Sequence, residues 1–294
     1  MAELISEKYK QWEAECDRRF NKLRSNEEEL NRIFIDIYGL GAELSPEVAE
    51  HDVTVRKADL QREVRSLISY AAGCLFGRYS VDCDGLCCTG GVPDPDKYRT
   101  IIPVADNIIP VRGGAPEDSL TAQIIRFVRA VYGEETLDEN LAFIADALGG
   151  DGTPREIIDR YLVRDFYRDH CRIYRKRPIY WLFSSGKKHG FSCLVYIHRF
   201  SMQTLPLIRE KYAAAALKRY QAQISELDEA LRCAPPSERQ VLRRQRGKLT
   251  LKLEETADFS ERLRTFAESP VSIDLNDGIK ANYAKFQSIL EKLV

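Results

Sequence analysis

Signals for membrane insertion and secretion are missing from this chain of 294 residues. It has no uninterrupted apolar run of the roughly 18–20 residues that a membrane-spanning helix requires. The N-terminal stretch MAELISEKYKQWEAEC has neither an apolar core nor a small-residue cleavage site, so it does not read as a secretory signal. We therefore expect a cytoplasmic protein without a membrane segment, in which the eight cysteines are thiols rather than disulfides.

Nucleotide-binding and hydrolytic motifs are also missing. The sequence contains no G-x-G-x-x-G, no G-x-x-x-x-G-K-[ST], no H-E-x-x-H and no G-x-S-x-G. With only four histidines, a metal-dependent or histidine-based active site has few possible positions. The motifs thus give no support to catalysis by this chain alone.

Net charge is nearly absent as well, because 44 Lys and Arg residues balance 45 Asp and Glu residues. This balance excludes a generally polybasic protein. The distribution is uneven, however: residues 1–169 carry a net charge of −11 and residues 170–294 carry +10. Residues 170–209 contain eight Lys and Arg residues and no acidic residue. The small total charge therefore describes a polarised molecule.

Hydrophobic periodicity and capping residues predict a mainly helical α+β fold. Helices are expected at residues 3–24, from Ser25 or Asn26 to Gly39 or Gly41, and at 57–76, 117–132, 136–148, 154–171, 203–232, 237–268 and 278–293. Strands are expected at 99–104, 107–112, 178–184 and 190–200, the last two forming a β-hairpin. Pro235 and Pro236 separate two long polar helices, which should pair as an antiparallel helical hairpin.

The same pattern suggests three segments. Residues 1–77 form an N-terminal helical segment, and residues 78–202 form a region that contains the β-hairpin at 178–200. Residues 203–294 contain the helical hairpin and a terminal helix.

The acid-free block at 170–209 is the main candidate for a functional surface. Its candidate contact residues are Arg172, Arg175, Lys176, Arg177, Lys187, Lys188, His189 and Arg199. Such side chains neutralise phosphates, and arginine also reads guanine edges, so duplex DNA is one partner that fits. The alternative is an ordinary solvated surface. The interleaved aromatic residues are expected to lie in the core, because alternation along a strand buries one face.

A second basic cluster lies on the predicted helix 237–268. Arg239, Arg243 and Arg246 are three or four residues apart and share one helix face. This face either tracks backbone phosphates or is simply solvated, and the solvated reading is the default.

Other clusters have ordinary structural readings. Cys83, Cys87 and Cys88 invite a zinc interpretation, but only one acceptable ligand pair is visible, so thiols without metal are favoured. The aspartates between residues 82 and 96 lack the bidentate glutamate of a calcium loop and fit turns better. His170 and His198 are expected to be structural.

Several segments resemble one protein family. They are NEEELNRIFIDIYGL at 26–40, LISYAAGCLFGRY at 67–79, DNIIP at 106–110, LAFIADAL at 141–148, YRKRPIYWLFSSG at 174–186, VYIHRF at 195–200 and IDLNDGIKANYAKF at 273–286. Together they are similar to the C-terminal portion of the PglX-type adenine-specific DNA methyltransferases of BREX phage-defence systems. The resemblance covers about residues 20–294.

This resemblance implies a function in adenine N6 methylation with S-adenosylmethionine. The family carries its glycine-rich cofactor motif and its Asn-Pro-Pro-Tyr catalytic motif in an N-terminal domain, and neither occurs here. No catalytic or cofactor-binding residue therefore transfers to this chain, which is expected to be a fragment or split product that holds the target-recognition and helical parts.

Two roles remain open from the sequence. The chain either binds duplex DNA for a methyltransferase domain, or docks through its basic block onto an acidic surface of that domain or of another defence-system subunit. A concave, solvent-facing basic surface favours DNA, whereas a flat surface with an apolar rim favours protein.

Overall fold

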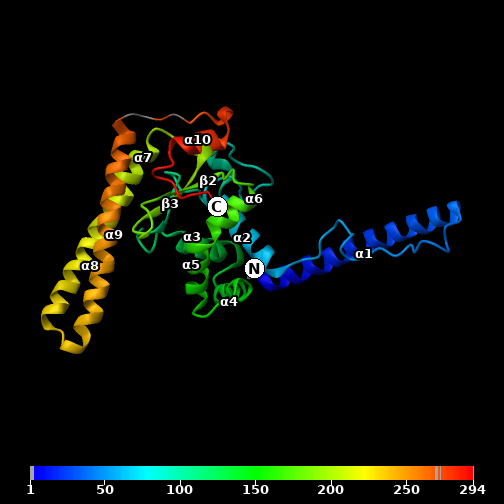
Figure 1. Ribbon diagram of the computed structural model, residues 1–294, viewed down its shortest axis with the longest axis horizontal. Helices are drawn as coiled ribbons and strands as arrows, with labels where there is room; N and C mark the ends of the chain where they lie inside the picture. The colour runs from blue at the N-terminus through cyan, green and yellow to red at the C-terminus, as the bar shows by residue number, and fades with distance from the viewer. Residues whose placement is uncertain (1–2, 269–270, 272, 294) are drawn as a thin grey trace.

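The computed structural model describes residues 3–268, 271 and 273–293. Two long helical arms project in different directions from a body of helices and one small sheet (Figure 1). The first arm is α1 (Ile5–Tyr38), and the second is the antiparallel pair α8 (Ala214–Cys233) and α9 (Pro236–Glu268). The predicted mainly helical α+β fold is confirmed. Within the described ranges, no helix has the length and apolar character needed to span a membrane.

The first arm differs from the sequence prediction, which divided it at Ser25 or Asn26. Both residues lie inside one continuous helix of 34 residues. Arg24 and Glu28 form an ion pair of 3.0 Å across the predicted boundary, and such (i, i+4) pairs support a helix. The helix ends where expected, at Gly39, whose φ of 67° is the left-handed conformation that glycine adopts without cost.

Five helices form most of the body. They are α2 (Leu60–Leu75), α3 (Leu120–Tyr132), α4 (Leu137–Leu148), α5 (Pro154–Arg164) and α6 (Phe166–Ile173). Side chains cap several of them as their sequences indicate: Thr153 and Glu156, for example, form a reciprocal capping box at the start of α5. The predicted helix 154–171 is divided at Asp165, where α5 ends and α6 begins. This break redirects the chain toward the sheet.

The sheet has three antiparallel strands, β1 (Ile108–Arg112), β2 (Tyr180–Ser184) and β3 (Ser192–Tyr196), in the order β1-β3-β2. Tyr180 faces Tyr196 and Ser184 faces Ser192 in the β2–β3 hairpin, as predicted. The strand predicted at 99–104 is absent. The backbone N–H groups of Arg99 and Thr100 instead donate to the Asp82 carboxylate, at 2.8 and 2.9 Å, so they are not available to a sheet.

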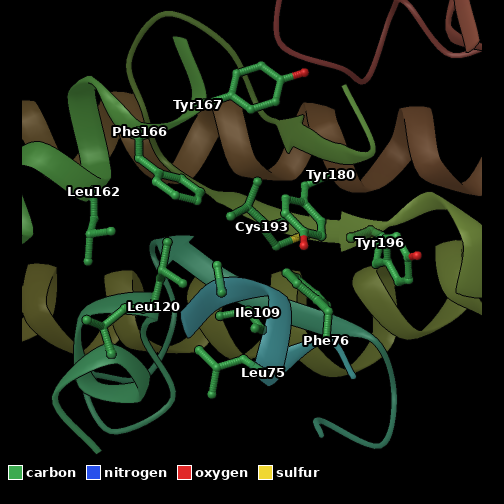
Figure 2. Close-up of a cluster of buried hydrophobic side chains, with 14 of the residues drawn as sticks. Leu75, Phe76, Ile109, Leu120, Leu162, Phe166, Tyr167, Tyr180, Cys193 and Tyr196 are labelled. Atoms are coloured by element: carbon green, nitrogen blue, oxygen red, sulfur yellow. The ribbon is translucent and has the colours of Figure 1, made fainter. Parts of the chain in front are cut away.

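The hydrophobic core surrounds this sheet on both faces. All five residues of β3 and four of the five in β2 are buried. The aromatic side chains of the two strands therefore lie in the core as expected, but both faces of the sheet are covered rather than one. Leu75 and Phe76 pack with Ile109, Tyr180 and Tyr196 in this core (Figure 2). The three segments proposed from the sequence all contribute side chains to this one cluster.

The C-terminal part continues the body and one arm. It contains α7 (Thr204–Leu207), a π-helical turn at Ile208–Ala213, and α10 (Ile279–Lys285). Single 3-10 turns lie at Pro95–Lys97, Ile197–Arg199 and Leu275–Asp277. The helix predicted at 278–293 ends early, because the backbone at Ile289 and Glu291 hydrogen-bonds to Ser184 and Leu182 of β2. The end of the chain thereby covers the free edge of that strand.

Candidate nucleic-acid interface

The loop that joins β2 to β3 presents three of the predicted contact residues. Lys187, Lys188 and His189 are exposed, and His189 has a φ of 56°, which is uncommon for a residue other than glycine. The loop lies close against α9: a Cβ atom at Gly190 would be 2.5 Å from the carbonyl oxygen of Lys252. Only glycine permits this approach, so the position of the lysines is fixed relative to α9.

Glu255 of α9 fastens this loop. Its carboxylate accepts hydrogen bonds from the Ser185 hydroxyl at 2.8 Å, from the Lys188 N–H at 2.6 Å and from the Gly190 N–H at 3.1 Å. Partial burial acts to raise the pKa of Glu255, but these hydrogen bonds outweigh it and the pKa is lowered. Because the carboxylate occupies the loop amides, an external anion would meet the lysine side chains rather than the loop backbone.

A hollow of about 230 Å³ lies beside the loop. Its basic lining residues come from four separate segments: Arg112 of β1, Arg164 of α5, Arg168 of α6, and His189. Among the lining residues, all of them in the described part of the chain, Glu291 is the one acidic side chain. We call Arg112, Arg164, Arg168 and His189, which line the hollow, together with Lys187 and Lys188 of the adjoining loop, the hairpin-tip surface. Its concave part is the hollow, and the two lysines lie beside it on the loop.

The basic side chains of the hairpin-tip surface differ in burial and in the hydrogen bonds and ion pairs that they form within the protein. Arg112 donates to the Val163 carbonyl at 2.7 Å, and burial lowers its pKa. Arg168 forms an ion pair with Asp165, while Arg164 is exposed. Partial burial and the charge of Arg112 lower the pKa of His189, so its ring is neutral at pH 7. The positive charge that is available to a ligand at this surface is therefore carried mainly by Lys187, Lys188 and Arg164.

The other half of the acid-free block lies at the opposite end of β2. Arg172 at the end of α6, and Arg175, Lys176 and Arg177 in the loop that follows, are exposed there. We call these four residues the basic loop. Since β2 has five residues and a strand rises about 3.3 Å per residue, roughly 17 Å of strand separates the basic loop from the hairpin tip. The structure therefore divides the block into two surfaces.

The basic loop has a strained backbone and a buried anchor. Arg175 and Lys176 have φ values of 50° and 60°. His170, which is 2% exposed, accepts hydrogen bonds at Nε2 from the Ile179 and Tyr180 N–H groups, at 3.2 and 3.1 Å. Burial lowers the pKa of His170 to about 3, so the ring stays neutral. It has the structural role expected of it, because it ties α6 to the start of β2.

Arg199 is committed to the fold. Its guanidinium donates to the carbonyl oxygens of Phe76, Val104 and Ala105 at 3.0–3.1 Å, and burial lowers its pKa. The side chain thereby joins the end of α2, at Phe76, to the segment that leads into β1, at Val104 and Ala105. Arg199 was a candidate DNA contact from the sequence, but its guanidinium already donates hydrogen bonds within the protein.

The three arginines predicted on α9 are also in different situations. Arg239 donates to the Ala234 carbonyl at 2.9 Å, at the turn between α8 and α9. Arg246 pairs with Asp228 of α8 at 2.5 Å, which lowers the pKa of Asp228 and joins the two helices. Arg243 is exposed. Two of the three arginines on this helix face therefore stabilise the α8–α9 arm.

Three residues of the hairpin-tip surface were missed by the sequence analysis. Arg112, Arg164 and Arg168 lie within residues 1–169, whose acidic total conceals them. The (i, i+4) spacing of Arg164 and Arg168 is the one local signal that was available.

The cysteine and aspartate side chains between residues 82 and 96 have ordinary structural contacts. Within the described residues, no group of three or more His, Cys, Asp or Glu side chains is arranged to hold an ion. The sulfur atoms of Cys83 and Cys87 are 3.0 Å apart, and Asp82 organises the turn at Arg99 and Thr100.

Comparison with known proteins places these surfaces in context. No family model matches the chain. The chain is 42% identical over 95% of its length to an adenine-specific methyltransferase PglX of Lacticaseibacillus casei (strain Zhang), of which the match covers 24%. It is also 42% identical over 77% of its length to an adenine-specific methyltransferase BrxX of Escherichia coli O9:H4 (strain HS), of which 20% is covered.

The chain spans about a quarter of the length of the first of these relatives and a fifth of the second. The resemblance drawn from its sequence motifs is confirmed, and the chain matches one portion of a PglX-type adenine-specific methyltransferase.

Proposed function

We propose that this chain is the DNA-binding, target-recognition part of an adenine-specific (N6) DNA methyltransferase that acts in BREX phage defence. The observation that carries the proposal is the hairpin-tip surface, which combines a mainly basic hollow with the exposed Lys187 and Lys188, in a chain that matches adenine-specific methyltransferases. Its lysines stand on a loop that Glu255 fixes to α9. A loop backbone that is already ordered lowers the entropic cost of binding phosphates.

The methyl donor would bind outside this chain. S-adenosylmethionine is implied by the relatives, but the described residues do not fit it. The sheet is antiparallel and has three strands, whereas nucleotide-like cofactors of open α/β folds bind at the carboxyl ends of parallel strands, beside a glycine-rich turn. The sequence has no such motif. Methyl transfer is therefore assigned to the part of the relatives that this chain does not match.

The task of this part would be to hold the duplex while a separate domain works on the base. An enzyme that modifies a base must take it out of the stack, and contacts to the surrounding backbone keep the duplex in register. Lys187, Lys188 and Arg164 would supply such phosphate contacts at the hairpin tip. Arg175, Lys176 and Arg177 form a second contact surface at the other end of β2.

Fluorescence anisotropy with a labelled duplex, from 50 to 200 mM salt, tests this proposal. We expect weak binding with a steep salt dependence, because each phosphate contact releases condensed counterions. Replacing Lys187 and Lys188 together with alanine should reduce the salt slope by about 2 and weaken binding roughly tenfold at low salt. Lys10→Ala/Lys22→Ala is the control, because both lysines are exposed on α1.

Three outcomes would overturn the proposal. Binding that does not change with salt would contradict phosphate contact. Equal effects of the hairpin-tip pair and the α1 pair would contradict the placement of the interface. Complete absence of duplex binding would favour the other role considered from the sequence, in which the basic residues dock onto an acidic protein surface of a methyltransferase domain or another defence-system subunit.

A further inference from the structure

The outer half of α1 carries a stripe of exposed apolar side chains. Leu30, Ile33, Phe34, Ile37 and Tyr38 are all exposed, the last two by 68% and 71%. Their spacing of three and four residues puts them on one face of the helix. An ordinary soluble surface carries large apolar side chains singly, so a continuous stripe of five marks an interaction site.

The stripe continues into a hollow. A cavity of about 270 Å³ is lined by Phe34 and Tyr38 of α1 together with Leu40 and Leu44 of the returning chain. Nearer the body, Phe20, Val48 and Val53 form a small core of their own, which holds the returning chain on α1. The residues that line the hollow belong to the last turns of α1 and to the segment that follows it, and Figure 1 shows this part of the chain at the outer end of the arm. The arm therefore ends in a preformed apolar surface.

Acidic residues surround this surface. Residues 25–50 contain seven Asp and Glu residues and one arginine. Such a charge balance repels nucleic acid, so this end of the molecule is not a second DNA contact. A second copy of the same chain would bring the same acidic residues against themselves, which is unfavourable at a symmetric contact. The complementary partner has an apolar patch rimmed by Lys and Arg.

The relatives indicate where that partner lies. The PglX match covers 95% of this chain, and the remaining 5% is too short to exclude the arm. About three quarters of that relative has no counterpart here. We infer that the exposed stripe of α1 is the docking surface for that unmatched portion, to which methyl transfer is assigned above. This inference rests on the proposed function, and it separates the two tasks of the chain: the arm holds protein, and the hairpin-tip surface holds DNA.

Hydrogen–deuterium exchange tests the docking in a full-length protein. This chain replaces the matched segment of the Lacticaseibacillus casei PglX, and exchange of the peptide at 28–40 is compared with that in the chain alone. We expect at least tenfold slower exchange in the full-length protein, because a docked helix opens less often. The peptide at 239–250 of the other arm is the internal control and should not change.

Point variants identify the stripe as the cause. Ile37→Glu should restore fast exchange of the peptide, whereas Ile102→Glu should not, although Ile102 is equally exposed at 68%. Unchanged exchange on going from the chain alone to the full-length protein would overturn the inference. If the full-length hybrid does not fold, co-expression of this chain with the unmatched portion of PglX gives the second measurement, in which a stoichiometric complex should form and should be lost in Ile37→Glu.

Two further measurements separate this inference from its alternatives. Sedimentation velocity of the chain alone should show a monomer, and a dimer abolished by Ile37→Glu would assign the stripe to self-association and overturn the inference. Duplex binding should be the same in Ile37→Glu and in the wild type. A failure of docking with intact DNA binding would thus overturn the inference alone, whereas a failure of DNA binding with intact docking would overturn the proposed DNA-binding role alone.

Discussion

The two loops at the ends of β2 carry similar basic charge but are held by different chemistry. The basic loop is tied through His170, a neutral ring that is 2% exposed and hydrogen-bonded to the backbone at the start of the strand. The hairpin tip is tied through Glu255, a charged group at the surface of α9. We therefore expect the basic loop to depend on the core for its conformation, whereas the hairpin tip should be able to loosen without unfolding of the protein.

The largest expected effect is that of removing the core anchor. His170→Ala leaves two buried N–H groups without an acceptor and creates a cavity, so we expect a loss of about 3–5 kcal/mol in the free energy of unfolding. Urea denaturation measures this loss. His51→Ala is the control, because the side chain of His51 is 84% exposed, and it should change stability by less than about 0.5 kcal/mol. Similar values for the two variants would show that His170 is no anchor.

The titration of His170 gives a second, somewhat smaller effect. Its pKa is about 3 in the folded protein and ordinarily 6.5. The unfolded chain therefore takes up a proton at a pH where the folded ring does not, so this stability is complete above pH 6.5 and is lost as pH falls toward 3. We expect a loss of roughly 1–2 kcal/mol between pH 6.5 and 5.0.

Comparison with His170→Gln isolates this effect, because glutamine can accept the same hydrogen bonds but does not titrate. His189 and His198, whose pKa values are also lowered by burial, are present in both proteins. Urea denaturation at the two pH values should therefore show a shallower decline in the variant. Parallel declines would place the proton uptake elsewhere.

Loosening the hairpin tip should cost less. Glu255→Ala removes the acceptor for three hydrogen bonds at a position that water can reach, and we expect a loss of about 2 kcal/mol. Amide exchange at Lys188 and Gly190 should rise before the protein unfolds, whereas exchange in β2 should not change. Glu254→Ala is the matched control, since Glu254 is the exposed neighbour on α9. A loss of core protection in Glu255→Ala would contradict the separation of the two loops.

Local signals in the sequence were sufficient for much of this fold. The capping residues and apolar spacing located the helices of the body, and the β2–β3 hairpin follows from its two aromatic, β-branched runs. The division at Ser25 was wrong, because Ser25 and Asn26 lie inside one continuous helix, in which Arg24 and Glu28 form an (i, i+4) ion pair across the predicted boundary. The strand predicted at 99–104 was wrong because Asp82, far from it in sequence, takes its amides.

The candidate interface could be predicted from the sequence only in part. The exposed lysines of the hairpin tip were predicted, because a polar loop between two aromatic runs must lie at the surface. Arg164 and Arg168 join them only through the fold. The partners of Arg199 and Arg246 are likewise distant in sequence, so the charge pattern alone did not distinguish arginines that hold the protein together from those that face solvent.

The smallest effect concerns the backbone of the basic loop. Lys176 has a φ of 60°, a conformation that costs a residue with a Cβ atom about 1 kcal/mol relative to glycine. Lys176→Gly should therefore stabilise the protein by about 0.5–1 kcal/mol while it weakens duplex binding, whereas Lys176→Ala should weaken binding equally without the gain in stability. Thermal unfolding and anisotropy together measure both quantities. If the glycine variant gains no stability, the strain is relieved elsewhere in the loop. If it gains stability and keeps full affinity for the duplex, Lys176 faces solvent rather than DNA. The hairpin tip is then the principal contact surface.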